Sequence, residues 1–263
     1  MPKSHIGVFD SGFGGLTVLK ALLERLPAAE YSYFGDTARL PYGSKSVETV
    51  ARYAVEASRF LESRGATLLV IACNTATALA LPQIKSSVGV PVLGVIEPGA
   101  ESAAQLSKSK RVVVIGTEAT VTSHAYKAAL SHRAMEASEK ACPLLVPLIE
   151  EGWVDHPVTE QVARIYLSEA FGPEFSDADV LLLGCTHYPL IKPLLARMLP
   201  GDVKIVDSAE STARAAASMN GDAEHGQLTL NFFVTDSVEK FCRLGARFLG
   251  QPIDHVQHVD LRE

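Results

Sequence analysis

Short apolar runs alternate with longer amphipathic segments along almost all of this 263-residue chain. Short apolar runs rich in Val, Ile and Leu are typical of buried strands, whereas apolar residues spaced three or four apart are typical of helices. These patterns predict strands at residues 6–10, 31–35, 68–72, 90–96, 111–116, 144–148, 179–184, 203–206, 228–235 and 253–259. They predict helices at residues 16–26, 46–62, 98–106, 123–131, 157–170, 190–199, 209–219 and 237–249, and a helix after residue 72 that Pro82 interrupts or ends.

Strands that alternate with helices predict an α/β fold in which mainly parallel sheets carry helices on both faces. The chain also repeats itself weakly, because IGVFDSG near the start and VVVIGTEAT in the middle are each followed by a later strand that ends in a cysteine. We therefore expect two pseudo-symmetric, doubly wound lobes that face one cleft. In such sheets the carboxyl ends of the strands open into the ligand site.

The composition excludes several classes of protein. The formal net charge is −6 and the cationic residues are scattered, which argues against a nucleic-acid or anionic-membrane surface. No stretch approaches the roughly 18 apolar residues of a membrane span, and no signal-peptide pattern stands at the start. The four cysteines are far apart in the sequence and form no CxxC pair, so we expect reduced thiols and a cytoplasmic location.

Two of the cysteines directly follow predicted strands. Cys73 lies in LLVIACNTAT and Cys185 lies in VLLLGCTHYP, so both are expected at the carboxyl ends of buried strands. Each is followed by hydrogen-bonding residues, which can bind a carboxylate and stabilise a thiolate at the start of a helix. Cys142 and Cys242 have no such neighbours, and we interpret them as small buried apolar residues.

Three kinds of chemistry use two such thiols. A metal site formed by Cys73, Cys185 and His187 lacks the closely spaced ligand pairs of structural zinc sites. A catalytic disulfide is usually formed by cysteines two residues apart, unlike these. The third is proton transfer, in which one thiol removes a proton from a carbon and the other returns a proton to the opposite face. An unperturbed thiol has a pKa of about 8.5, so a modest shift brings it into the physiological range.

Other polar motifs have a structural as well as a functional interpretation. Asp10 in DSGFGG either caps a tight strand-to-helix turn or acts in the cleft, and the glycines lack the spacing of a dinucleotide-binding loop. LPYG at residues 40–43 is typical of a loop. In VPLIEEG at residues 146–152, two acids follow a weakly predicted strand and are typical of a solvated loop. His187 fits a histidine that is simply satisfied near a helix start.

In this order and spacing, the motifs DSGFGG, LPYG, ACNTAT, TEAT, VPLIEEG and GCTHYP closely resemble those of bacterial glutamate racemases, in the aspartate/glutamate racemase family. The resemblance extends from residue 6 to about residue 219, and the paired CNT and CTH motifs are its most specific part. It implies an isomerase that interconverts L-glutamate and D-glutamate without a cofactor or a metal. It also implies a role in peptidoglycan synthesis, through the supply of D-glutamate for the cell wall.

The resemblance further implies the roles of individual residues. Cys73 would deprotonate D-glutamate while Cys185 protonates the opposite face, with the roles reversed for L-glutamate. Asp10 would assist the first thiol, and His187 and Glu150 would assist the second. The residues implied to hold the carboxylates and the ammonium group of the substrate are Asp10, Ser11, Tyr42, Gly43, Asn74, Thr75, Thr117, Thr120 and Thr186.

By the same resemblance, the C-terminal segment returns to complete the first lobe, which would comprise residues 1–97 and 208–263, with residues 98–207 forming the second lobe. The expected partners are glutamate and a second copy of the chain in a homodimer. An aspartate racemase-like enzyme of the same two-cysteine architecture is an alternative, although His187 stands where that branch typically has a glutamate. A two-lobed amino-acid-binding protein is a further alternative, but it would have no use for paired thiols.

Overall fold

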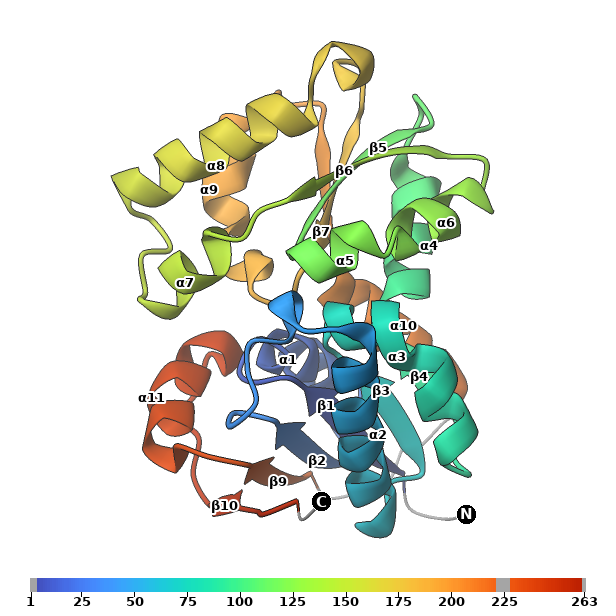
Figure 1. The fold of residues 1–263 in the computed structure, drawn as a ribbon, viewed down its shortest axis with the longest axis vertical. Coiled ribbons are helices and arrows are strands. Elements are labelled where there is room, and N and C mark those ends of the chain that lie inside the picture. Colours follow the sequence, from blue (N-terminus) through green and yellow to red (C-terminus); the bar gives the residue numbers. More distant parts are fainter. Residues whose placement is uncertain (1–3, 221–227, 262–263) are drawn as a thin grey trace. The chain divides into compact units, whose positions relative to one another are not determined.

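The computed structural model describes residues 4–220 and 228–261 and contains two parallel sheets (Figure 1). Contacts divide the chain into two compact units. The first unit comprises the residues up to Val95 together with those from Ala209 onward, and the second comprises Ile96–Ser208. The predicted α/β class is therefore confirmed. The predicted lobes, residues 1–97 with 208–263 and residues 98–207, stay a prediction.

The first unit contains a six-stranded sheet in the order β10-β9-β2-β1-β3-β4, and all of its neighbouring strands are parallel. Its strands are β1 (His5–Asp10), β2 (Glu30–Gly35), β3 (Leu68–Ile71), β4 (Val92–Gly94), β9 (Thr229–Val234) and β10 (Val256–His258). Its helices are α1 (Leu16–Arg25), the 3₁₀ helix η1 (Tyr42–Ser44), α2 (Val47–Ser63), α3 (Asn74–Ser87), α10 (Ser208–Asn220), which begins at the unit boundary, and α11 (Val238–Leu249).

The connections of this sheet determine which helices share a face. The connections that contain α1 and α11 lead toward the β10 edge of the sheet, whereas those that contain α2 and α3 lead toward the β4 edge. Because crossovers between parallel strands are right-handed, α1 and α11 lie on one face of the sheet, and α2 and α3 lie on the other. In agreement, α1 packs against α11 and α2 packs against α3. The C-terminal segment joins the same sheet, since β9 pairs with β2 and places Val234 opposite Gly35.

The second unit contains a four-stranded parallel sheet in the order β6-β5-β7-β8. Its strands are β5 (Arg111–Gly116), β6 (Glu136–Ala141), β7 (Val180–Gly184) and β8 (Lys204–Asp207). Its helices are α4 (Ile96–Leu106), α5 (Glu118–Thr122), α6 (Ala125–Ser131), α7 (Leu145–Glu150), α8 (Pro157–Ala170), η2 (Pro173–Phe175), η3 (Tyr188–Ile191) and α9 (Lys192–Met198). Helix α4 packs against α6, and α8 packs against α9.

The predicted strand at residues 144–148 is wrong. This apolar run forms helix α7, whose buried residues Leu145 and Ile149 are four positions apart and therefore share one helical face. The strand of this region is β6, which the sequence did not predict because its residues EASEKA are mostly polar. β6 is an edge strand, where charged side chains are common.

Two predicted helices differ in detail. Pro82 lies inside α3 and does not end it, although it provides no amide hydrogen for the preceding turn. The helix continues because Ala80 and Ile84 on either side of Pro82 are buried and α3 packs against α2. The predicted helix at residues 123–131 begins only at Ala125, because His124 has a φ of 53° and separates α5 from α6.

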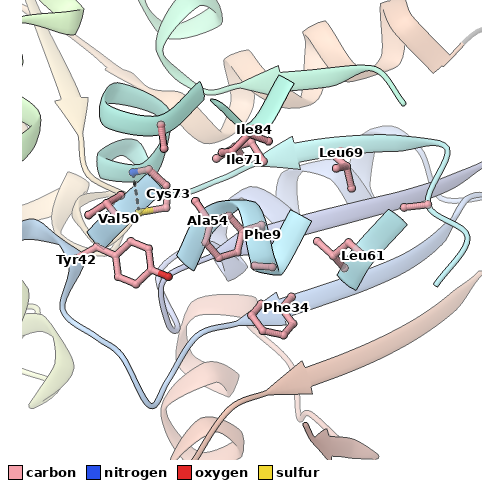
Figure 2. Close-up of a cluster of buried hydrophobic side chains, with 14 of the residues drawn as sticks. Phe9, Phe34, Tyr42, Val50, Ala54, Leu61, Leu69, Ile71, Cys73 and Ile84 are labelled. Carbon is pink, nitrogen blue, oxygen red and sulfur yellow. Dashed lines mark hydrogen bonds between the residues drawn. The ribbon is translucent and has the colours of Figure 1, made fainter. Parts of the chain in front are cut away.

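A cluster of buried side chains lies between the sheet of the first unit and helices α2 and α3 (Figure 2). Phe9, Phe34 and Ile71 contribute from the strands, and Leu61 contributes from α2. Cys73 belongs to the same cluster, so its thiol lies at the end of an apolar core. Among the described residues, no helix is both long and apolar enough to cross a membrane.

Replacing Leu61 by alanine is expected to lower the free energy of unfolding by about 2–5 kcal/mol, because the change leaves a cavity in this cluster. Leu106 provides a matched control, since it is 51% exposed and its replacement by alanine should change stability by less than about 0.5 kcal/mol. Urea unfolding followed by circular dichroism measures both values. Equal losses in the two variants would contradict a stabilising role for the cluster.

Candidate active site

In the first unit, the carboxyl ends of β1 and β3 bring two predicted site residues to the same edge of the sheet. Asp10 is the last residue of β1, and Cys73 follows the end of β3 by two positions. The strands pair with Phe9 opposite Ile71, and the Ala72 amide donates a hydrogen bond of 2.8 Å to the Phe9 carbonyl. Both site residues are buried, with exposed fractions of 1% for Asp10 and 5% for Cys73.

Asp10 caps the turn that follows its strand. Its Oδ2 accepts a hydrogen bond of 2.9 Å from the Gly12 amide. The turn packs closely on this side chain, because a Cβ at position 15 would lie 2.5 Å from the Asp10 Cβ. Glycine at position 15 is therefore required for the turn to leave β1 and enter α1. The sequence left open whether Asp10 caps a turn or acts on a ligand, and the hydrogen bond from Gly12 shows the capping contact.

The Cys73 thiol combines two polar contacts with an apolar environment. Cys73 is the N-cap residue of α3, and its Sγ accepts a hydrogen bond of 3.4 Å from the Ala76 amide, drawn as a dashed line in Figure 2. The thiol also donates to the Ser11 Oγ at 3.5 Å. The positive end of the helix dipole stabilises negative charge, so this position favours the thiolate.

Tyr42 lies at the start of η1, close to the same thiol. Its hydroxyl donates a hydrogen bond of 2.5 Å to Asp36 Oδ2. Burial, the charge and hydrogen bond of Asp36 and the charge of Cys73 raise the pKa of Tyr42 well above its usual range, so Tyr42 remains a donor. Sequence reasoning missed Asp36, whose fully buried carboxylate also accepts a hydrogen bond of 2.8 Å from Thr235 on the returning C-terminal segment.

Three further predicted residues of the first unit lie in the same two segments. Gly43 lies in η1 next to Tyr42. Asn74 and Thr75 are the first two residues of α3, and both are buried. The first turn of a helix is a favourable place for anions such as carboxylates, because its backbone N–H groups point out of the helix end.

In the second unit, β5 and β7 bring another set of predicted residues together. The two strands pair with Gly116 opposite Gly184, so Thr117 and Cys185 follow at the same edge. Thr117 is the N-cap of α5, and its Oγ1 lies 2.9 Å from the Oγ1 of Thr120. Cys185 is 5% exposed, as is the adjacent Thr186.

His187 links the second thiol to a carboxylate. Its Nδ1 lies 3.9 Å from the Cys185 Sγ, and its Nε2 lies 3.1 Å from the Glu150 Oε1. Burial alone would lower the pKa of His187, but hydrogen bonds to Cys185 and Glu150 and the charges of both raise it to about 10. The ring is therefore an imidazolium at neutral pH, with its positive charge between the Cys185 sulfur and the Glu150 carboxylate.

Glu150 reaches this histidine from the end of α7, not from a loop after a strand as the sequence suggested. Glu150 therefore lies beside His187, but its segment is a helix instead of the expected strand and loop. The helical conformation of α7 buries Leu145 and Ile149 and places the next residue, Glu150, at the helix end. The acid and the histidine are 37 positions apart in the sequence, and their ion pair is partly buried.

Tyr188 is a residue of this site that sequence reasoning missed. It is fully buried, and its hydroxyl donates to the carbonyls of Gly116 at 3.2 Å and Cys142 at 3.1 Å. It therefore ties the loop after β7 to the ends of β5 and β6. Cys142 is buried as predicted, and burial raises the pKa of its thiol to about 12, so it stays protonated.

Within the described residues, no three His, Cys, Asp or Glu side chains are grouped as ligands of a metal ion. Polar residues gather at the two strand edges in two separate groups. One has Cys73 with Asp10 and Ser11, and the other has Cys185 with His187 and Glu150. Doubly wound parallel sheets in two units, each with a buried and hydrogen-bonded thiol at a strand end, define the class of α/β protein to which the chain belongs.

Comparison with known proteins identifies the family within this class. The sequence pattern of the Asp/Glu/Hydantoin racemase family matches residues 6–216, and the chain belongs to this family. It is 58% identical to the glutamate racemase of Koribacter versatilis, over 97% of each chain. Among solved structures, a glutamate racemase isoform from Bacillus anthracis is 38% identical with a TM-score of 0.92 and covers 98% of both chains. The glutamate racemase of Francisella tularensis in complex with D-glutamate is 36% identical with a TM-score of 0.90 and covers 99% of both chains.

Replacing Glu150 by glutamine is expected to lower the pKa of His187 from about 10 toward its usual range, because the amide lacks the carboxylate charge. Titration of the His187 ring nitrogens by NMR measures this pKa. In the parent chain the folded pKa is above the unfolded one, so protonation favours folding. This contribution is full below pH 6.5 and is lost as pH rises through about 10.

The matched control for this titration is Glu151→Gln, which removes the adjacent, exposed carboxylate. That variant should leave the titration of His187 unchanged. A pKa near 6.5 for His187 in the parent chain would contradict the charged pair described here.

Proposed function

We propose that the chain interconverts L-glutamate and D-glutamate without a cofactor, by moving the α-proton between carbon and the thiols of Cys73 and Cys185. One observation carries this proposal. Each unit has a buried thiol at the end of a parallel strand, in contact with Ser11 in one unit and with His187 in the other. The family and the glutamate racemases that resemble this chain along almost their whole length support the same activity.

The proposed reaction inverts the α-carbon in two proton transfers. With D-glutamate, the Cys73 thiolate takes the α-proton, and the Cys185 thiol gives a proton to the opposite face. The chain is then left with a thiol at Cys73 and a thiolate at Cys185, which is the form that accepts L-glutamate. The same two groups therefore catalyse both directions, with their roles exchanged.

The two thiols are supported by different groups, in keeping with these roles. The amide at the start of α3 stabilises the thiolate of Cys73, and Asp10 assists the same thiol from the neighbouring strand. The imidazolium of His187 supports Cys185, with Glu150 behind it. The α-proton of an amino acid is far less acidic than a thiol, so preorganised donors must also stabilise the negative charge that develops on the substrate.

Hydroxyl groups, amides and helix starts at the two strand edges supply such donors. We assign substrate binding to Asp10, Ser11, Tyr42, Gly43, Asn74, Thr75, Thr117, Thr120 and Thr186. Their position at the first turns of helices, at caps and at strand ends supports this assignment, since carboxylates bind well at helix N-termini. D-glutamate is the ligand in the related structure from Francisella tularensis.

We further propose that the product D-glutamate serves peptidoglycan synthesis and that the chain acts in the cytoplasm as a homodimer. The family resemblance supports these three statements. Light scattering of the purified chain tests the homodimer, and a mass equal to that of one chain would contradict it.

The proposal predicts that the chain racemises glutamate in deuterium oxide without added cofactor and places solvent deuterium on the α-carbon. Cys73→Ser and Cys185→Ser should each lower the rate at least about a hundredfold, because each removes one of the two acid–base groups. Polarimetry measures racemisation, and proton NMR measures loss of the α-proton signal.

Cys242→Ser is the matched control, because Cys242 is a half-buried thiol on α11, away from the strand ends. It should keep the activity of the parent chain. Full activity in either of the other serine variants would refute the two-thiol mechanism. Aspartate is assayed in parallel, and preferential turnover of aspartate would replace glutamate as the substrate.

A further inference from the structure

The turn after β1 begins beside Asp10, the last residue of the strand, and carries Ser11, which contacts the Cys73 thiol. The Gly12 amide on this turn donates back to the Asp10 carboxylate at 2.9 Å. Ser11 Oγ accepts from the Cys73 thiol at 3.5 Å. Any shift of the Gly12 peptide therefore moves both the carboxylate and the hydroxyl relative to the thiol.

Tyr33 holds this turn from the neighbouring strand. It lies on β2, which pairs with β1 and places Gly35 opposite Asp10. Its side chain is fully buried, and its hydroxyl donates a hydrogen bond of 3.0 Å to the Gly12 carbonyl. Both backbone groups of Gly12 are therefore held, the amide by Asp10 and the carbonyl by Tyr33.

The position of this hydroxyl is fixed by packing. The ring of Tyr33 contacts Phe232 and Phe241, with centroid distances of 6.2 and 5.8 Å. The turn also lies close to β2, because a Cβ at Gly35 would be 2.6 Å from the Gly12 carbonyl oxygen and 3.3 Å from the Tyr33 ring. The hydrogen bond thus connects a rigid aromatic cluster to the turn that carries Asp10.

We propose that Tyr33 is a positioning residue for the first proton-transfer step: its hydroxyl fixes the Gly12 carbonyl and so keeps Asp10 and Ser11 aligned with the Cys73 thiol. This inference rests on the proposed function, since it concerns the transfer of the α-proton to the Cys73 Sγ. Tyr33 itself touches neither the substrate nor the reacting atoms in this account.

The electrostatics of Tyr33 agree with this role. Burial, then the charges of Asp10 and Cys73, and then a hydrogen bond with the Asp10 side chain raise the pKa of Tyr33 well above its usual range. The hydroxyl therefore keeps its proton at neutral pH, and it remains a donor to the turn. The same charges show that Tyr33 lies within electrostatic range of both groups.

Tyr31 is a matched control on the same strand. It lies two positions before Tyr33, so both side chains are on the same face of β2. It is also fully buried, and its hydroxyl donates to the carbonyls of Leu22 at 3.0 Å and Leu26 at 2.8 Å, at the end of α1. Tyr31→Phe and Tyr33→Phe thus remove the same group from similar surroundings, but only Tyr33 holds the turn.

Primary isotope effects test the inference, measured on kcat/KM with glutamate deuterated at the α-carbon. The two enantiomers have equal free energies, so kcat/KM in both directions must fall by the same factor, which we expect to be about tenfold or more in Tyr33→Phe. Because only the Cys73 step becomes harder, the isotope effect should rise with D-glutamate and fall with L-glutamate. Tyr31→Phe should keep both isotope effects of the parent chain.

Isotope effects do not depend on the fraction of folded enzyme, so a less stable Tyr33→Phe preparation still gives a result. Gly35→Ala is a second variant, which pushes the Gly12 carbonyl away from an intact Tyr33 and should shift the isotope effects in the same way. Gly201→Ala is its control, because nothing lies within 4 Å of the added Cβ. An active parent chain with unchanged isotope effects in Tyr33→Phe and Gly35→Ala would overturn the inference, whereas an inactive parent chain would refute the proposed function instead.

Discussion

The structure depends on one constraint, which is that the carboxyl ends of adjacent parallel strands meet at one edge of a sheet. The pairing of β1 with β3 brings Asp10 to Cys73, and the pairing of β5 with β7 brings Thr117 to Cys185. The apolar strands are buried, so each cysteine lies where a buried strand ends and the next segment begins. Backbone amides and polar side chains of that next segment therefore lie beside the thiol.

The two thiols have different polar neighbours. At Cys73, the Ala76 amide at the start of a helix donates to the sulfur, and the hydrogen bonds of Gly12 with Asp10 and Tyr33 hold the neighbouring turn. At Cys185, a histidine held by Glu150 carries a positive charge close to the sulfur. We infer that substitutions at these neighbours affect the two thiols differently, although each thiol serves in both directions of the proposed reaction.

The sequence predicted the parallel fold and the two thiol positions, because buried strands followed by polar residues leave a clear pattern. It misjudged α7, because the apolar run before Glu150 fits both a strand and a helix, and only its packing decides. It missed β6, whose polar composition suits a sheet edge. Periodicity also carries no sign that Val234 pairs with Gly35, since such long-range pairing depends on the whole sheet. In the sequence, Tyr33 resembles an ordinary core residue, and only the structure shows that its hydroxyl donates a hydrogen bond to the Gly12 carbonyl.

The central claim is that both thiols act on one α-carbon, from opposite faces. A crystal structure of the chain with bound D-glutamate tests it most directly, through the distances from the α-carbon to the Sγ atoms of Cys73 and Cys185. We expect both sulfurs within about 3.5 Å of the α-carbon, on opposite sides of it. Glutamate bound with its α-carbon beside only one sulfur, or beside neither, would contradict it.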